Sequence, residues 1–276
     1  TATNVFNVAV GHNAGKLITT GVENTFIGGL AGDASTTASQ NTAVGYNCFS
    51  SNTTGSVNTA TGWFSLTLNT TGSQNAAFGE RALRSNTTAS FNTAVGSLAL
   101  TANTTAANNT AVGYNSLGAN TTGERNVAVG ATAGAAITTG IRNVLMGYTA
   151  GGSLITGSNN AAFGEQALSN DTNGFYSTAF GHAALANQNF SSSTGAYNTA
   201  VGYNAGLQVT TGIHNILIGG LAGDALTTGQ ANVVVGVNAL TADTLGSRAV
   251  AIGKDALANQ NFTTATNTYN VAVGFS

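Results

Sequence analysis

Three histidines and one cysteine carry the strongest metal-binding and nucleophilic chemistry in this sequence. They are His12, His182, His214 and Cys48. A metal site needs two to four ligands that converge, and these residues show no such spacing. The single cysteine also excludes an internal disulfide framework. We therefore expect no metal site and no cofactor.

The carboxylates are equally dispersed. Glu80 and Glu165 occupy equivalent positions five repeat units apart, which is roughly 24 Å at the spacing of β-strands. A pair of catalytic carboxylates needs about 5–9.5 Å. Asp33 and Asp224 each follow Ala-Gly, but no Asp-rich calcium motif surrounds them. We therefore expect a protein that is not an enzyme.

The composition excludes further classes of function. Lys and Arg total 7, Asp and Glu total 9, and charged residues make up 6% of the 276 residues. Scattered basic residues do not form a nucleic-acid-binding surface. No apolar run approaches the ~18 residues of a membrane-spanning helix, so we expect no membrane insertion. No signal peptide is recognisable, and a chain that begins at Thr1 is expected to be processed, excised or incomplete.

A 17-residue repeat must position all of these side chains. Most copies contain Asn-x-x-hydrophobic-Gly, and 13 of the 15 intervals between successive repeat glycines are 17 residues, whereas two are 21. No stretch escapes the pattern, so we predict a single continuous domain over residues 1–276. The repeat glycines are Gly11, Gly28, Gly45, Gly62, Gly79, Gly96, Gly113, Gly130, Gly147, Gly164, Gly181, Gly202, Gly219, Gly236, Gly253 and Gly274.

Each copy is predicted to form one coil of a β-solenoid. Short runs such as 41–44 are rich in Thr and Val and end at glycine, which is typical of a strand followed by a turn. One coil cannot bury a core alone, but coils stacked at ~4.8 Å bury a continuous one. Helices are disfavoured by the abundance of Gly, Thr and Asn. We predict an all-β solenoid of about 16 coils.

Two adjacent positions of the repeat are candidates for the inside and the outside of the coil. The residue directly before the glycine, the pre-glycine column, is the most strictly apolar, and we expect it to face inward. The residue before that, the alanine column, is then expected to face outward as a smooth subunit contact. The pre-glycine column is Val10, Ile27, Val44, Thr61, Phe78, Val95, Val112, Val129, Met146, Phe163, Phe180, Val201, Ile218, Val235, Ile252 and Val273. The alanine column includes Ala9, Ala43, Ala60, Ala77, Ala94, Ala111 and Ala128.

A further pair of positions predicts a fixed interior volume. Four residues after the glycine, most copies carry Leu or Phe, such as Phe49, and others carry Gly, such as Gly134. The glycine copies supply a large apolar residue three positions later, such as Ile137. One bulky filler per coil is therefore expected, with Gly32 and Ser35 as an unexplained exception.

Asparagine recurs four residues before the glycine in nearly every copy, as at Asn24, Asn41 and Asn58. Asn tolerates left-handed turns and can bond neighbouring backbone, and stacked copies can form an amide ladder. We expect this column to form corners and ladders rather than a ligand site.

The run Asn-Thr-Ala-Val-Gly-Tyr-Asn-x-x, at 41–49, 109–117 and 198–206, resembles the head repeats of trimeric autotransporter adhesins of the YadA type and similar runs in bacteriophage tail-fibre proteins. The resemblance covers the whole chain. It implies a left-handed parallel β-roll, a homotrimer with a shared core, and an exposed, non-enzymatic binding role. The repeat is longer than the usual adhesin head repeat, and no heptads of a coiled-coil stalk occur. The tail-fibre or free-filament version therefore fits better.

Aromatic residues in two columns are the candidate receptor-binding residues. Exposed aromatic side chains give rigid contact area for sugar rings or partner proteins, although they can also cover turns and subunit seams. Trp63 and Phe64 form the sharpest local departure from the repeat. The post-glycine column, one residue after the glycine, contains Tyr46, Trp63, Tyr114, Tyr148 and Tyr203. The corner column, five residues before the glycine, contains Phe6, Phe91, Tyr176, Tyr197 and Tyr269.

The two 21-residue copies supply candidate binding loops. Ala-Leu-Ala-Asn-Gln-Asn-Phe at 184–190 recurs at 256–262, and the two copies end with Tyr197 and Tyr269. Insertions in a solenoid form loops on one face. Phe190 and Phe262 are interpreted as loop tips or as anchors.

Threonine pairs such as Thr53-Thr54 recur along the chain, and eight of them fall in successive copies between Thr19 and Thr139. Neighbouring strand residues point to opposite faces, so one Thr of each pair is expected to face outward. A flat Thr array is typical of ice-binding solenoids, but these use Thr-x-Thr spacing, so a β-branched strand with hydroxyl bonds between coils is favoured.

These patterns favour an extracellular fibre segment, from a virion or a cell surface, that binds a cell-surface glycan or a protein receptor. An end-to-end assembling extracellular filament and an ice-binding solenoid are the alternatives. Stability is expected from stacked β-ladders and an apolar core rather than from charge.

Overall fold

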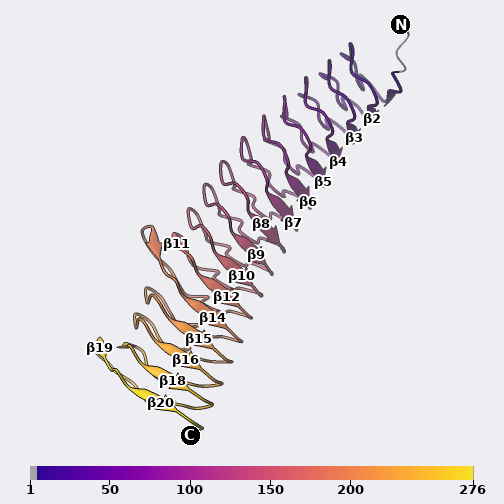
Figure 1. Ribbon diagram of the computed structural model, residues 1–276. Coiled ribbons are helices and arrows are strands. Elements are labelled where there is room, and N and C mark those ends of the chain that lie inside the picture. The colour runs from indigo at the N-terminus through magenta and orange to yellow at the C-terminus, as the bar shows by residue number, and fades with distance from the viewer. Residues whose placement is uncertain (1–4, 276) are drawn as a thin grey trace. The chain divides into compact units, whose positions relative to one another are not determined.

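The computed structural model describes residues 5–275 and shows a parallel β-solenoid of about sixteen coils with a repeat of about 17 residues. No helix occurs among these residues. The chain divides into two compact units, Thr1–Thr132 and Ala133–Ser276. Within each unit the coils follow one another with their strands side by side (Figure 1). The predicted fold class is confirmed.

Every coil contributes one three-residue strand that ends at the residue before the repeat glycine. In the first unit these strands are β1 (Val8–Val10), β2 (Thr25–Ile27), β3 (Thr42–Val44), β4 (Thr59–Thr61), β5 (Ala76–Phe78), β6 (Thr93–Val95), β7 (Thr110–Val112) and β8 (Val127–Val129). In the second unit they are β9 (Val144–Met146), β10 (Ala161–Phe163), β12 (Thr178–Phe180), β14 (Thr199–Val201), β15 (Ile216–Ile218), β16 (Val233–Val235), β18 (Val250–Ile252) and β20 (Val271–Val273).

Successive strands pair in parallel, with equivalent residues opposite each other. In the first unit Val8 pairs with Thr25, one repeat later, and the same offset continues to β8. In the second unit β12 and β14 pair with an offset of 21, since Thr178 lies opposite Thr199. The four extra residues of each long coil are accommodated at two further parallel pairs. These pairs are β11 (Gly174–Phe175) with β13 (Thr194–Gly195), and β17 (Gly246–Ser247) with β19 (Thr266–Asn267).

The repeat glycine is required because successive coils approach each other closely at this position. Gly79 has a φ of +135°, and a Cβ there would lie 2.6 Å from the backbone carbonyl of Gly96. A side chain would therefore clash with backbone that cannot move without breaking the ladder. The strict recurrence of glycine in the sequence follows from this contact.

The corners of the coil lie at positions where residues other than glycine adopt left-handed backbone. Arg81 and Leu83 follow Gly79 with φ of 55° and 51°, and Gln74 precedes it with φ of 58°. The position of Gln74, five residues before the repeat glycine, belongs to the corner column. The expectation that the recurrent Asn itself takes the left-handed corner is therefore wrong, because the preceding residue does.

The expected orientation of the strand is also wrong. The alanine column faces the interior: from Phe26 to Ala251 its members are fully buried. No member of the pre-glycine column is buried, and Phe180 is 54% exposed. Side chains alternate between the two faces of the strand, as expected. However, the column that was predicted to face inward faces outward, and the column that was predicted to face outward faces inward. The alanine column is consequently no subunit contact, and the apolar pre-glycine column is the outer face.

The interior volume explains this orientation. Leu and Phe fillers such as Phe49 and Leu66 are fully buried, as are Ile137 and Leu154 in the glycine-type coils. The prediction that the filler comes from either of two positions is confirmed. The prediction of a single bulky residue per coil fails in two coils, where Leu145 and Leu217 are buried in addition to the fillers Leu154 and Leu226. In most coils that hold a Leu or Phe filler, the residue opposite it is Ala. Coils with Gly at the fourth position after the repeat glycine have room for a second large residue, as Leu145 and Leu154 show.

The exception at Gly32 and Ser35 has a clear cause. Phe26 replaces Ala in the alanine column of that coil, and its buried ring fills the interior. A Cβ on Gly32 would lie 2.7 Å from Cζ of Phe26. The filler of this coil therefore comes from a third position.

Asparagine side chains join the coils through hydrogen bonds. Oδ1 of Asn58 accepts a bond of 3.0 Å from the backbone N–H of Asn75, and its Nδ2 donates to the carbonyl of Gly72 at 3.0 Å. The predicted ladder is confirmed. A second amide ladder runs through the Leu-type coils, at the position that holds the filler in the glycine-type coils. There Nδ2 of Asn69 donates to Oδ1 of Asn52 at 2.9 Å.

The threonine pairs divide their roles as predicted. Oγ1 of Thr53 donates to the carbonyl of Thr70 at 3.1 Å, and the same bond joins equivalent threonines of neighbouring coils. Thr54 is exposed. The pairs therefore offer mainly a single exposed file, with the other hydroxyls used between coils.

The interior-volume rule predicts the outcome of moving the filler. Phe26→Ala should lower the free energy of unfolding by about 3–5 kcal/mol because it leaves a cavity. Phe26→Ala combined with Gly32→Phe should recover more than half of that loss, since it reproduces the arrangement of Ala43 and Phe49, whose φ of 57° matches the 56° of Gly32. Urea denaturation measures both values. A double variant less stable than Phe26→Ala would contradict the rule.

Candidate receptor-binding surface

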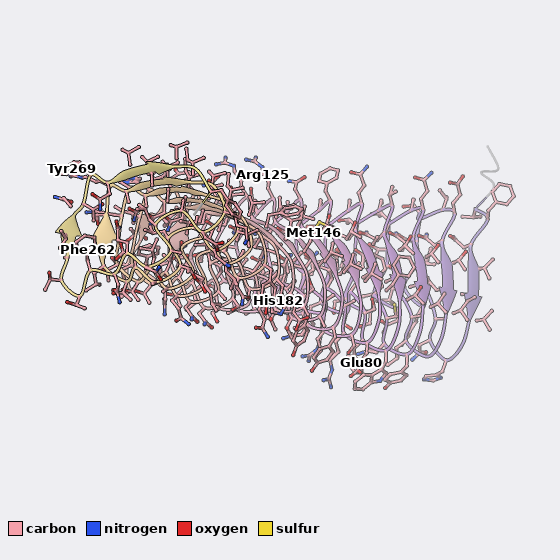
Figure 2. All side chains as sticks on the ribbon, turned by 90° about the horizontal axis from the view of Figure 1, so that it is seen from below. Glu80, Arg125, Met146, His182, Phe262 and Tyr269 are labelled. Atoms are coloured by element: carbon pink, nitrogen blue, oxygen red, sulfur yellow. The ribbon has the colours of Figure 1, made fainter. Side chains whose placement is uncertain are left out.

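The aromatic residues of the post-glycine column lie on the outside of the coils. Tyr46, Tyr114, Tyr148 and Tyr203 are each more than half exposed. They directly follow the glycine at which the backbone turns, so their side chains project from the end of the main strand. Glu80 and His182 belong to the same column, and Figure 2 shows both side chains projecting outward.

Trp63, Phe64 and Tyr46 form one aromatic cluster in the first unit. The Trp63 and Phe64 rings meet edge to face at 4.5 Å, and Phe64 contacts Tyr46 at 6.0 Å. The guanidinium of Arg81 lies 4.8 Å from the centre of the Trp63 ring. Such a cation–π contact contributes about 0.5–1 kcal/mol at an exposed site. The aromatic residues were predicted from the repeat, whereas Arg81, which belongs to the next coil, was not.

The corner column forms an exposed aromatic stack in the second unit. The rings of Tyr176 and Tyr197 are 4.9 Å apart, and Tyr197 lies 5.6 Å from the imidazole of His214. In the same column, the Arg248 guanidinium lies 5.5 Å from the centre of the Tyr269 ring and donates a hydrogen bond to its hydroxyl. His214 and Arg248 are additional surface residues. His214 lies one repeat after Tyr197, and Arg248 lies one repeat before Tyr269, so the sequence repeat alone places both in the corner column.

The loops of the two long coils are anchored inward. Phe190 is only 4% exposed, so it is an anchor rather than a loop tip. Phe262 is half-buried and holds the equivalent position in the last coil. The exposed aromatic side chains of these coils are therefore Tyr197 and Tyr269.

A buried carboxylate fixes each of these loops. Oδ1 of Asp171 accepts bonds from the backbone N–H groups of Gly174 at 3.0 Å and Phe190 at 3.4 Å, and Oδ2 accepts one from Gln188 at 2.7 Å. Asp243 makes the same three contacts with Gly246, Phe262 and Gln260. Burial raises the pKa of the Asp171 carboxyl, and its hydrogen bonds oppose that shift.

The remaining titratable residues do not converge on a reactive centre. His182 stacks on Tyr203 at 5.4 Å, whereas His214 lies in the corner column. Among residues 5–275 there is no group of three or more His, Cys, Asp or Glu side chains that could hold a metal ion. Burial raises the pKa of the Cys48 thiol to about 12, so it is an inert packing residue.

A cavity of about 670 Å³ lies at the last described coil. Its lining includes Leu257 and Ala272, which occupy interior positions of the repeat, together with Val271 and Val273. It is the open interior of that coil and carries no cluster of catalytic side chains. None of the described segments is a helix of the length and hydrophobicity needed to cross a membrane.

The residues of the candidate receptor-binding surface are therefore identified from the sequence and the structure of this chain alone. Neither a protein-family model nor a curated protein matches the chain. The fold and the exposed columns define a repeat β-solenoid with an apolar outer sheet face that is bordered by aromatic columns.

The Asp171 site predicts a pH dependence of stability. The folded-state pKa lies above the unfolded one, so the stabilisation from protonating Asp171 is present at acidic pH and is lost as pH rises through the folded pKa. The free energy of unfolding of the wild type minus that of Asp171→Asn should therefore decrease from pH 4 to pH 7. Urea denaturation at both values measures it. An unchanged or rising difference would contradict the assignment.

Proposed function

We propose that the chain is a non-enzymatic structural and adhesive segment of an extracellular fibre, of the phage tail-fibre or surface-adhesin kind. The observation that supports this most strongly is the outer face of the main sheet. Its pre-glycine column is apolar except for Thr61, contains no charged residue, and is exposed or half-buried in the isolated chain.

An apolar face of this regularity calls for a covering partner, because soluble proteins rarely leave large apolar patches in water. In the second unit the face includes Phe163 and Phe180, whose rings stack 5.4 Å apart, and Phe180 is 54% exposed. In the first unit it includes Ile27, Phe78 and Val95, all exposed. Further copies of the same chain present the same residues at the same spacing, so the proposed partner is the chain itself. The resemblance to the head repeats of trimeric adhesins makes the proposed assembly a homotrimer.

This assembly leaves the aromatic columns at the margins of the covered face. The post-glycine column follows one end of each main strand, and the corner column precedes the other end. Side chains there remain available for a cell-surface glycan or protein receptor. The threonine pairs offer mainly one exposed file, so no observation favours the ice-binding alternative over this one.

The proposal predicts that charge on the outer face separates the copies. Val95→Asp combined with Val112→Asp should convert the assembly to monomers of 27.3 kDa, whereas the wild type should have about three times that mass. The β-sheet signal in circular dichroism should persist, since neither side chain lies in the interior. Light scattering measures the mass.

Matched control substitutions lie in the same two coils. Thr105 and Thr122 are exposed, away from the outer face of the main sheet. Thr105→Asp combined with Thr122→Asp adds the same charge and should leave the mass unchanged. A wild type that is already a monomer, or a trimer insensitive to the valine substitutions, would refute the proposed interface.

A further inference from the structure

One exposed column of the second unit has a gap at Gly220. Backbone hydrogen bonds hold consecutive members of the post-glycine column in line. The N–H of Leu221 donates to the carbonyl of Tyr203 at 2.8 Å, and the N–H of Asn238 donates to that of Gly220 at 3.0 Å. Tyr203, Gly220 and Val237 are therefore neighbours on three successive coils. The middle one has no side chain.

The Cβ position of Gly220 is open. A Cβ built on Gly220 meets no atom within 4 Å. Gly29, the other glycine of this column, differs, because its Cβ position lies 3.4 Å from the Tyr46 ring. The gap at Gly220 is therefore uncovered, whereas the one at Gly29 is filled by its neighbour.

The walls of the gap are an aromatic ring and an aliphatic side chain. One face of Tyr203 stacks on His182, with 22° between the planes, so its other face is directed toward the gap. Tyr203 is 58% and Val237 is 48% exposed. Their coils are two strand spacings apart, about 9.6 Å, which leaves room for one ring stacked on Tyr203 and in contact with Val237.

The polar groups beside the gap are neutral amides. Asn204 follows Tyr203, and its side chain makes no hydrogen bond with other described residues. Asn238 follows Val237 and uses its Nδ2 to bond Asp255 at 3.1 Å. Lys254, the next member of the column, is paired with Asp255 at 3.0 Å. The surroundings therefore favour an uncharged ligand that has one apolar face and a rim of hydroxyl groups.

We propose that Tyr203, Gly220 and Val237 form a binding site for a single neutral pyranose ring. The axial C–H face of the sugar stacks on Tyr203, and its hydroxyl groups bond the amides of Asn204 and Asn238. A peptide aromatic side chain fits the width of the gap but brings no hydroxyl groups to the side chain of Asn204 or to Oδ1 of Asn238. The site rests on the proposed recognition role and specifies its ligand class.

Filling the gap tests the site directly. Gly220→Tyr is tolerated structurally, because the Cβ position is open and Tyr already occupies this column at Tyr46, Tyr114, Tyr148 and Tyr203. Titrations followed by saturation-transfer NMR use the methyl glycosides of glucose, galactose and N-acetylglucosamine. We expect at least one to bind the wild type, with saturation on one face of the ring. Binding should weaken at least tenfold in Gly220→Tyr and in Tyr203→Ala.

Gly220→Ala is the matched control, because it leaves the gap open and should keep the wild-type affinity. Equal binding to wild type and Gly220→Tyr would overturn the site while leaving glycan recognition elsewhere intact. No binding of any of the three glycosides, or binding of N-acetyltyrosinamide in their place, would overturn the ligand class. The proposed trimer is judged separately by its mass, so failure of the site and failure of the fibre role are distinguishable.

Discussion

The structure depends on the in-register stacking of each coil on the next at the distance set by backbone hydrogen bonds. The repeat glycine permits this contact, since a Cβ at Gly79 would lie 2.6 Å from the backbone of Gly96. Once the register is fixed, every position of the repeat becomes a column of side chains. Asparagine ladders, threonine hydroxyl bonds and aromatic stacks are all consequences of one spacing. Ion pairs contribute little, and the two present among residues 5–275 join sequence neighbours at the surface.

The second constraint is the small volume that a 17-residue coil encloses. One Leu, Ile or Phe fills most of it, and in most coils the alanine column supplies only a methyl group opposite that filler. The coil of Phe26 obeys the same limit on volume. Phe26 fills the interior from the alanine column, and Gly32 and Ser35 occupy the two usual filler positions. The larger apolar residues that remain must face outward. A solenoid of this type therefore presents an apolar outer face because its interior is already full.

The repeat was sufficient to predict the solenoid, the filler exchange, the asparagine ladder and the exposure of Tyr46, Tyr114, Tyr148 and Tyr203. It did not predict the sense of the strand, because both Ala94 and Val95 belong to apolar columns and hydrophobicity alone does not rank them. The interior volume of the coil determines which of the two columns faces inward. Arg81 was missed because its contact with Trp63 crosses to the next coil at an offset position. The buried Asp171 was missed because its partners come from an inserted loop.

Maleimide labelling of single cysteines introduced at Ala94, Val95 and Thr88 tests the central claim most directly. Cys48 does not interfere, because it is buried and its pKa is raised to about 12. The account predicts that Ala94→Cys is protected at every protein concentration, that Thr88→Cys always reacts, and that Val95→Cys is protected in the assembled protein and reacts on dilution to monomers. Rapid labelling of Ala94→Cys, or labelling of Val95→Cys at the rate of Thr88→Cys at all concentrations, would contradict it.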